Sequence, residues 1–208
     1  MRGTNGLPEN KAIIKQKMGA AAGVASPILA FVCILTAVAS YPKFNWANNA
    51  LSDLGIIPGI TGPLLNFGLY ASGFLGLYFA LFGFFSFIGK NWVGKIGASL
   101  FAATSIALIL IGVFNESFHG IHYAVSVAFF ALAPISMFII TCAFLFANQT
   151  KMAIFTVLIG VAAALPWVLQ FTFNYLPNVA VPEFLSGLAI SIWTVTLSFK
   201  MTTKTNDN

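Results

Sequence analysis

The chain has 208 residues, of which 59% are hydrophobic and only 7% are charged, and its mean hydropathy is +0.90. A soluble domain carries about 25% charged residues, so this composition excludes a water-soluble globular protein. The net charge of +5 does not indicate a nucleic-acid-binding protein, because the basic residues form no patch interleaved with exposed aromatic residues. The composition therefore predicts a protein that lies in a lipid bilayer.

Six apolar runs follow one another along the chain, and each is long enough to cross about 30 Å of hydrocarbon as a helix. They do not alternate with a period of two residues, and only helices or closed barrels satisfy the backbone in lipid. The predicted fold class is therefore all-α, a polytopic membrane protein with a bundle of six transmembrane helices. The expected spans are 19–40, 63–88, 95–114, 121–147, 152–173 and 183–199.

The basic residues indicate how these spans are oriented. If the N-terminus is cytoplasmic, Lys43 alone of the ten Lys and Arg residues falls in an outer segment. This is the positive-inside pattern, and it holds only for an even number of spans. We therefore expect a multi-pass protein of the cell membrane, with cytoplasmic tails 1–18 and 200–208 flanking a transmembrane domain 19–199. The inner basic residues are Arg2, Lys11, Lys15, Lys17, Lys90, Lys95, Lys151, Lys200 and Lys204.

The tryptophan and cysteine residues provide less information about the fold. The tryptophans are expected in the interfacial belts of the membrane; they are Trp46, Trp92, Trp167 and Trp193. The two cysteines, Cys33 and Cys142, lie inside apolar runs at different depths, so they predict neither a disulfide nor a metal site.

The remaining ionisable residues gather on the outer side. Three of the five acidic residues and both histidines fall there, whereas the inner halves of the spans offer only Ser, Thr and Cys. Because six bundled spans bring their outer connections together, we expect one outer pocket covered by the 41–62 loop, which is long for a compact connection. The expected ligand-binding residues are Asn49, Asn66, Asn115, Gln170 and Glu183.

The stretch 46–55 contains Asp53, the acidic residue of the first outer connection. A preceding asparagine predicts the cap of a short helix over 50–54, in which Asn49 and Asp53 share a face. Two interpretations stay open for Asp53. It binds local backbone amides, as carboxylates in loops often do, or it serves a reaction together with Ser52. Ser52 and Asp53 are therefore the candidate catalytic residues.

Glu116, His119 and His122 follow one another at steps of three residues in the turn between the third and fourth spans. Wherever this turn is helical, the spacing places the three side chains beside one another. One carboxylate with two imidazoles is a ligand set that suits zinc or another divalent cation. The alternative is that all three are polar turn residues that bind water at the membrane surface.

Three short motifs resemble those of one known family. They are Asn49-Ala-Leu-Ser-Asp-Leu-Gly55, the Asn66-Phe-Gly68 start of the second span, and the turn over 112–122. They resemble a family of prokaryotic six-span proteins called domain of unknown function nine hundred and ninety-eight. The resemblance covers nearly the whole chain, and it implies membership but no particular activity.

A looser resemblance points to an enzyme. The residues Ser52, Asp53, His119 and His122 are similar to the Ser, Asp and His set of the alkaline ceramidase and adiponectin-receptor superfamily of membrane zinc hydrolases. This chain departs from that pattern, since it has six spans rather than seven and lacks a third histidine. The resemblance therefore implies that Glu116 would complete a zinc site.

Two functions stay open at this point. The first is an integral membrane protein whose outer pocket binds a lipid or another small amphiphile without a reaction. The alternative is a metal-dependent hydrolase that acts on outer-leaflet lipid through a zinc-bound water. A transporter of a neutral solute fits least, because transport pathways usually carry ionisable residues at mid-depth. The hydrolase would use zinc, and no other cofactor is expected. The expected partners are the lipid bilayer and a lipid ligand.

Overall fold

A computed structural model describes residues 6–204 of the chain, with side chains described over 13–203. Over the described residues the protein is all-helical and has no strand. Six helices are long and apolar enough to cross a membrane, which confirms the predicted fold class. The outermost parts of the two predicted tails, residues 1–5 and 205–208, lie outside the described residues.

The main helices are α1 (Gly6–Ser40), α2 (Thr61–Tyr78), α4 (Trp92–Val113), α5 (His119–Phe146), α6 (Thr150–Phe173) and α7 (Ala180–Lys204). The second membrane crossing is composite, because α2 continues through the π-helical turn η2 (Phe79–Phe84) into α3 (Phe85–Ile88). Two short 3-10 helices lie in the connections. They are η1 (Ser52–Ile56) between α1 and α2, and η3 (Glu116–Phe118) between α4 and α5.

Helix α1 begins before the apolar run in which we expected the first span. It starts at Gly6, ahead of the expected start of that span at Gly19. Residues 9–17 contain Glu, Lys, Gln and Ala, which are good helix formers and allow the helix to continue beyond the apolar run. The Gln16 side-chain amide donates to the backbone oxygen of Met201 at 2.8 Å, so this extension is held against α7.

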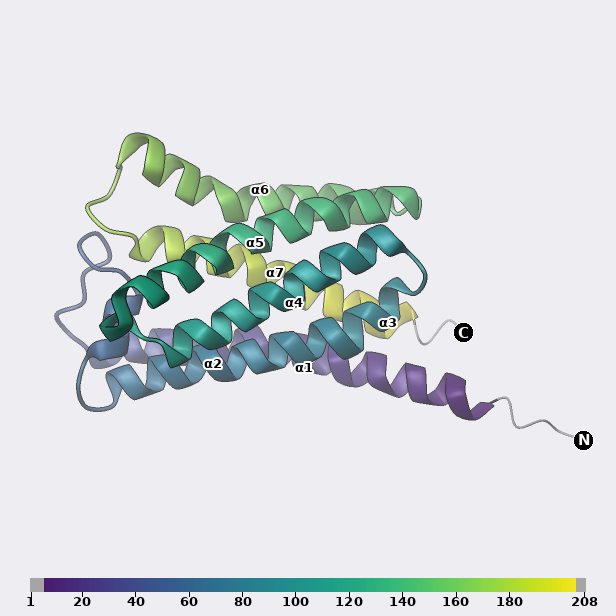
Figure 1. Cartoon of the computed structure of the whole chain (residues 1–208), viewed down its shortest axis with the longest axis horizontal. Coiled ribbons are helices and arrows are strands. Elements are labelled where there is room, and N and C mark those ends of the chain that lie inside the picture. The colour runs from purple at the N-terminus through teal and green to yellow at the C-terminus, as the bar shows by residue number, and fades with distance from the viewer. Residues whose placement is uncertain (1–5, 205–208) are drawn as a thin grey trace, which may run out of the picture.

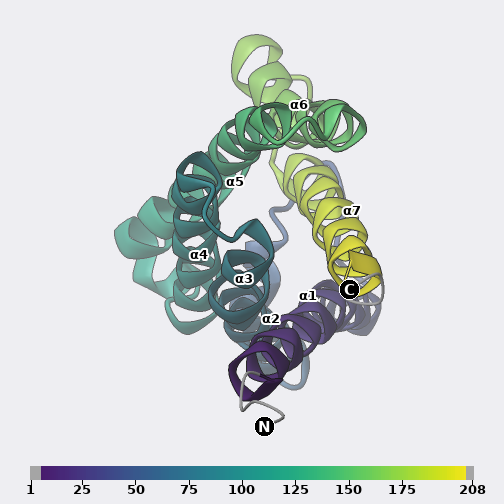
Figure 2. The ribbon, with the colours of Figure 1, turned by 90° about the vertical axis from the view of Figure 1, so that its right-hand side faces the viewer.

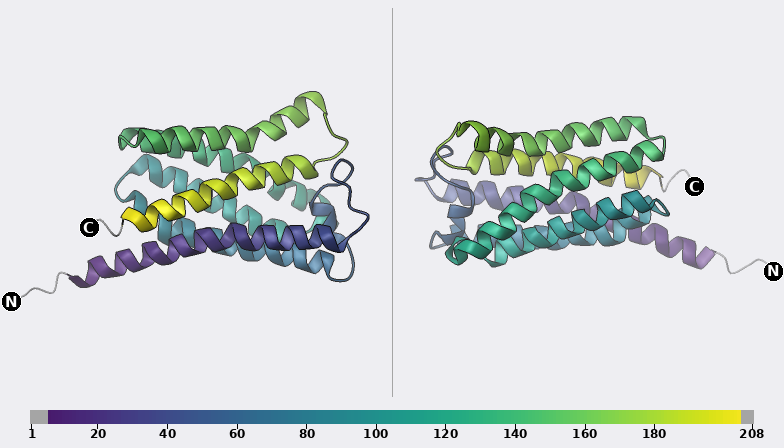
Figure 3. Two further views of the ribbon diagram at one scale, coloured as in Figure 1. Left: turned by 180° about the vertical axis from the view of Figure 1, so that it is seen from behind. Right: turned by 45° about the horizontal axis from the view of Figure 1, so that its top comes forward.

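The six membrane-crossing segments form a ring in which each packs against the next and α7 closes on α1 (Figure 2). Both ends of the chain lie at one end of the ring (Figure 1). The α1–α2, α4–α5 and α6–α7 connections lie at the other end, as the two views of Figure 3 also show. The ring therefore has two chemically different ends.

Charge separates these two ends. The end with the α1–α2, α4–α5 and α6–α7 connections carries Asp53, Glu116 and Glu183, and we call it the acidic end. The opposite end, called the basic end, carries Lys15, Lys17, Lys90, Lys95, Lys151 and Lys200. Among the side chains that the structure describes, Lys43 is the one Lys or Arg at the acidic end.

Aromatic side chains fill the ring toward its basic end. Phe79, Phe84, Phe101 and Trp193 are at most 4% exposed and belong to one core cluster, which we call the aromatic plug. The Trp193 ring centroid lies 5.2 Å from that of Phe101 and 5.7 Å from that of Phe84. The expectation that Trp193 lies at the membrane interface is therefore wrong. Its indole N–H donates to the Thr156 hydroxyl at 3.1 Å, which satisfies the polar group inside the protein.

Candidate functional site

A cavity of about 130 Å³ lies inside the ring, between the acidic end and the aromatic plug. One buried water needs about 10–15 Å³, so the cavity has room for several waters or a short hydrocarbon chain. Helices α1, α2, α4, α5 and α7 form its wall, and Leu51 and Ser52 of the α1–α2 connection line the end that faces the acidic end of the ring. Along α7 the lining runs from Glu183 to Thr194, which is about 16 Å of helix.

Polar groups lie at the two ends of this cavity, and its middle is apolar. At the acidic end the lining contains the Glu183 carboxyl group and the Ser52 hydroxyl. The middle contains Phe31, Leu69, Leu108, Phe129, Phe130 and Phe184. The deep end carries hydroxyl groups from four helices, which are Ser26, Ser72, Thr104, Ser105, Ser191 and Thr194.

Several of the deep hydroxyl groups already donate their proton to a backbone carbonyl. Ser26 donates to the Ser72 carbonyl at 2.8 Å, and Thr194 donates within its own helix at 2.8 Å. Thr104 and Ser105 also donate to carbonyls of their own helix. The Ser72 hydroxyl is fully buried without a hydrogen-bond partner. Buried polar atoms normally find partners, so this hydroxyl is one of a few exceptions among the described side chains.

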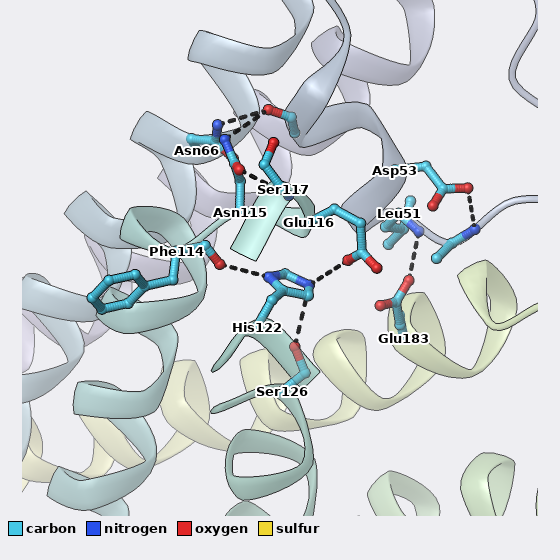
Figure 4. Close-up of polar contacts among 12 residues, drawn as sticks. Leu51, Asp53, Asn66, Phe114, Asn115, Glu116, Ser117, His122, Ser126 and Glu183 are labelled. Carbon is cyan, nitrogen blue, oxygen red and sulfur yellow. Dashed lines mark hydrogen bonds and ion pairs between the residues drawn. The ribbon is translucent and has the colours of Figure 1, made fainter. Parts of the chain in front are cut away.

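Glu183, in the first turn of α7, ties the α1–α2 connection to the cavity. Its Oε2 atom accepts a hydrogen bond from the backbone N–H of Leu51 at 2.5 Å. Asp53 and Glu116 lie near the same carboxyl group. Figure 4 shows the three carboxylates close together, beneath the α1–α2 connection. The structure therefore brings together the three acids that the sequence analysis expected on one side of the membrane.

Asp53 is bonded within its own loop. Its Oδ2 accepts from the Asn49 side-chain amide at 2.9 Å and from the Ala50 backbone N–H at 3.0 Å. The expected contact between Asn49 and Asp53 is present, but the helix is a 3-10 helix that begins at Ser52 rather than an α-helix over 50–54. Asp53 thus has the local role of a turn carboxylate, and of the two candidate catalytic residues only Ser52 lines the cavity.

The candidate amide residues also bind backbone groups. Asn66 and Asn115 both donate to the Gly55 carbonyl, at 2.9 and 3.4 Å. The Gln170 amide donates to a backbone carbonyl of the α6–α7 connection at 2.8 Å. Together with Asn49, these side chains hold the connections at the acidic end, and the cavity lining contains none of the four.

His122 and Glu116 form a close pair (Figure 4). The Nδ1 atom of His122 lies 2.7 Å from the Phe114 carbonyl oxygen, so Nδ1 carries the proton, because a carbonyl only accepts. The Nε2 atom lies 3.0 Å from Glu116 Oε2 and 3.4 Å from the Ser126 hydroxyl. Both ring nitrogens of His122 therefore have polar partners.

His119 does not join this pair. It is exposed at the start of α5, with a backbone φ of 27°. Within the part of the chain that the structure describes, no three His, Cys, Asp or Glu residues come together to hold a metal ion. Zinc binding by Glu116, His119 and His122 stays a prediction, which metal analysis of the intact protein tests directly.

Comparison with known families assigns the chain to one of them. The family described as Protein of unknown function (DUF998) matches residues 24–200, a range that includes every residue lining the cavity. The chain belongs to this family. No curated protein and no solved structure matches it. The predicted membership in this family of membrane proteins is therefore confirmed, and the family description specifies no activity.

Sequence reasoning missed the deep hydroxyl groups of this DUF998 family member. The sequence does show Ser and Thr in the middle of four spans, and Ser26, Ser72, Ser105 and Thr194 all lie there. An isolated Ser or Thr can bind a carbonyl of its own helix anywhere in a span, so residue type alone does not show which hydroxyl groups face a cavity. Only the packing of the ring places these side chains around one cavity.

Proposed function

We propose that the protein binds a small amphiphile with a single hydrocarbon chain inside the ring. The polar head lies at Glu183 and Ser52, and the chain lies along the apolar middle of the wall. The observation that supports this proposal is the cavity itself, whose lining is apolar apart from polar groups at its ends. Sites for small molecules are typically concave and apolar, with a few polar groups that orient the ligand.

The aromatic plug favours binding over passage through the membrane. Phe79 and Phe84 are fully buried, and they fill the ring on the basic side of the cavity. A ligand that reaches the cavity from the acidic end therefore meets packed aromatic rings rather than a continuous path. This arrangement supports a receptor or carrier of an amphiphile.

We also propose that the acidic end faces outward, so that the ligand comes from the outer leaflet. The support is the gathering of lysines at the basic end, since cytoplasmic segments of membrane proteins are rich in Lys and Arg. The exposed Lys43 reports on this orientation. A cysteine introduced there (Lys43→Cys) should react in intact cells with a maleimide that cannot cross membranes. Reaction only after the membrane is opened would reverse the proposed orientation.

Trp193 provides the test of ligand binding. It is fully buried, and it contacts Phe101, which lines the cavity. With its head at Glu183, an undecanol brominated at its terminal carbon would carry the bromine about 15 Å deeper, at the level of Trp193. Bromine quenches indole fluorescence at short range. The experiment uses nanodiscs and a variant that keeps Trp193 alone, in which phenylalanine replaces Trp46, Trp92 and Trp167.

Gly187 offers a way to fill the cavity. It lines the cavity, and a Cβ atom added there would meet only the Phe31 ring, at 3.9 Å. A Gly187→Leu side chain would therefore extend into the space proposed for the ligand. Gly120 is the matched control, because it is exposed and an added Cβ would meet nothing within 4 Å.

We expect brominated undecanol to quench Trp193 with a saturable dependence on concentration. The quenching should persist in Gly120→Leu and be lost in Gly187→Leu. If the quenching instead rose linearly with concentration and were the same in Gly187→Leu, the amphiphile would act from the surrounding bilayer. That result would refute binding in the cavity.

A further inference from the structure

We infer that the hydrocarbon chain of the bound amphiphile ends in a hydroxyl group, which lies among the serine and threonine hydroxyl groups at the deep end of the cavity. This inference rests on the proposed function and adds the chemistry of the ligand's far end to it. The deep hydroxyl groups support it through their convergence, their unused lone pairs and their distance from the acidic end.

Hydroxyl groups of two helices meet beside a third helix at the deep end. Ser26 belongs to α1, Ser105 to α4 and Gly76 to α2, and all three line the cavity. A Cβ atom added to Gly76 would lie 3.0 Å from the Ser105 Oγ and 3.6 Å from the Ser26 Oγ. The two oxygens therefore face one point beside the Gly76 backbone. Helix α7 adds Ser191 and Thr194 to the same end of the lining.

These oxygens can accept a further hydrogen bond. A hydroxyl group has one proton and two lone pairs. Ser26 donates its proton to a carbonyl of α2 at 2.8 Å, and Ser105 donates to a carbonyl of its own helix at 3.1 Å. Thr104 and Thr194 donate within their own helices in the same way. Each oxygen keeps lone pairs once its proton is used, so this wall is matched to a guest that donates a hydrogen bond.

The Ser191 hydroxyl is available as well. It lines the cavity on α7 and is half-buried, and none of the hydrogen bonds found among the described side chains involves it. Such a hydroxyl can accept from a guest and donate to it at the same time. A methyl group at this depth would use neither Ser191 nor the lone pairs of Ser26 and Ser105, and polar groups buried without partners are unfavourable. A chain that ends in a hydroxyl group avoids this cost.

The cavity as a whole suits a chain that is polar at both of its ends. Its first polar end contains Glu183 and Ser52, and the lining reaches Thr194 about 16 Å deeper along α7. Between the two ends the wall is apolar, with side chains such as Phe31 and Phe129. The aromatic plug fills the ring beyond the deep end, so a chain cannot continue past the hydroxyl groups. A chain of the length of undecanol therefore ends at this level.

Three compounds of matched length test the far end of the chain. Undecanol ends in a methyl group, an undecanediol with a hydroxyl group at each end adds a donor there, and a decanol that ends in a methoxy group adds an oxygen without a donor. Each competes in nanodiscs with brominated undecanol for the cavity of the variant that keeps Trp193 alone. Apparent affinities are corrected for partitioning, which is measured in protein-free nanodiscs. We expect the diol to bind about tenfold more tightly than undecanol, and the ether to gain nothing over undecanol.

Gly76→Ala and Ser105→Ala test the deep end from two sides. The first covers the point between Ser26 and Ser105 with a methyl group, and the second removes one acceptor oxygen. We expect the preference for the diol over undecanol to fall to within about threefold in each. If one variant does not fold, the other variant and the order of the three compounds still decide the question.

Ser86→Ala is the matched control for Ser105→Ala. Ser86 also donates to the backbone carbonyl four residues before it, at 2.8 Å, but it is exposed and does not line the cavity. This variant should keep the full preference for the diol.

The possible results separate the two proposals. Equal binding of the diol and undecanol, equal binding of the diol and the ether, or a full preference for the diol that persists in both Gly76→Ala and Ser105→Ala would overturn the terminal hydroxyl group and leave amphiphile binding intact. Quenching that none of the three compounds relieves would overturn the proposed function itself.

Discussion

A close helix crossing in the ring gives a prediction about stability. Helix α1 meets the π-helical turn η2 where Gly19 faces Gly83, and a Cβ atom added to Gly19 would lie 2.3 Å from the Gly83 Cα. The next nearest atom is the Gly83 backbone nitrogen, at 2.4 Å. Because both neighbours are backbone atoms, no side chain can rotate to relieve the overlap. Small residues of this kind let membrane helices approach closely.

The size of the effect follows from this geometry. Overpacking a well-packed interface costs about 1–3 kcal/mol, and contact with backbone places Gly19→Ala near the upper value. For a chain of this length, 1 kcal/mol changes the Tm by about 2–4 °C, so we expect Gly19→Ala to lower the Tm by about 6–12 °C. At Gly83 the nearest atom is the flexible end of the Met201 side chain, at 2.8 Å. We therefore expect Gly83→Ala to lower the Tm by about half as much.

The Tm values of the alanine variants can be compared by thermal unfolding of the purified proteins in one detergent, with the helical circular dichroism signal as the measure of unfolding. The third variant is Gly120→Ala, where an added Cβ meets nothing within 4 Å. We expect its Tm to stay within about 2 °C of the unmodified protein. If Gly19→Ala unfolded at the same temperature as Gly120→Ala, α1 and η2 would not cross as closely as described.

Two further predictions concern hydrogen bonds. Thr156→Val leaves the buried Trp193 N–H without an acceptor and should cost about 1–3 kcal/mol of stability. In a double-mutant cycle with Trp193→Phe the losses should be less than additive, and strict additivity would contradict the bond. Asn66→Ala removes a donor to the Gly55 carbonyl and should cost about 1 kcal/mol in thermal unfolding. The exposed Asn48→Ala is its control and should change stability by less than about 0.5 kcal/mol, so equal losses would contradict the assigned role of Asn66.

The sequence predicts the membrane-crossing helices well, because their signal is local. Each span requires only a long apolar run, and three of the five connections between the runs contain a lysine, which is Lys43, Lys90 or Lys151. The gathering of the acids at one end is predicted for the same reason, since an even number of crossings fixes which connections share an end. The start of α1 is predicted less well, because a helix can continue into water beyond the apolar run.

The cavity could not be predicted from the sequence. In the helix of a soluble protein, the apolar stripe shows which face is buried. Here every face of each helix is apolar, so the sequence does not show which face turns toward the inside of the ring. Ser72 and Leu69 lie on the same helix and both line the cavity, while nearby Phe67 and Phe74 are exposed to the surroundings of the ring. Only the packing of all six crossings distinguishes these positions.

The hydrogen-bond partners of the polar side chains at the acidic end also could not be predicted from the sequence. Asn115 and Asn66 bind the carbonyl of Gly55, and Asn115 is 60 residues from that partner. Side-chain type identifies a hydrogen-bonding group but not which backbone atom folding brings to it. The expected interfacial position of Trp193 was wrong for a related reason. Its indole N–H donates to the Thr156 hydroxyl on another helix, so the polar group is satisfied inside the protein.

The central claim is that an amphiphile lies inside the ring with its head at the acidic end. The most direct measurement is a crystal structure grown from a lipidic mesophase with undecanol brominated at its terminal carbon. We expect one anomalous bromine peak beside Phe101 and Trp193, and continuous density from there to Glu183. Bromine peaks found only on the outer faces of the helices, with no ligand density in the cavity, would contradict the account.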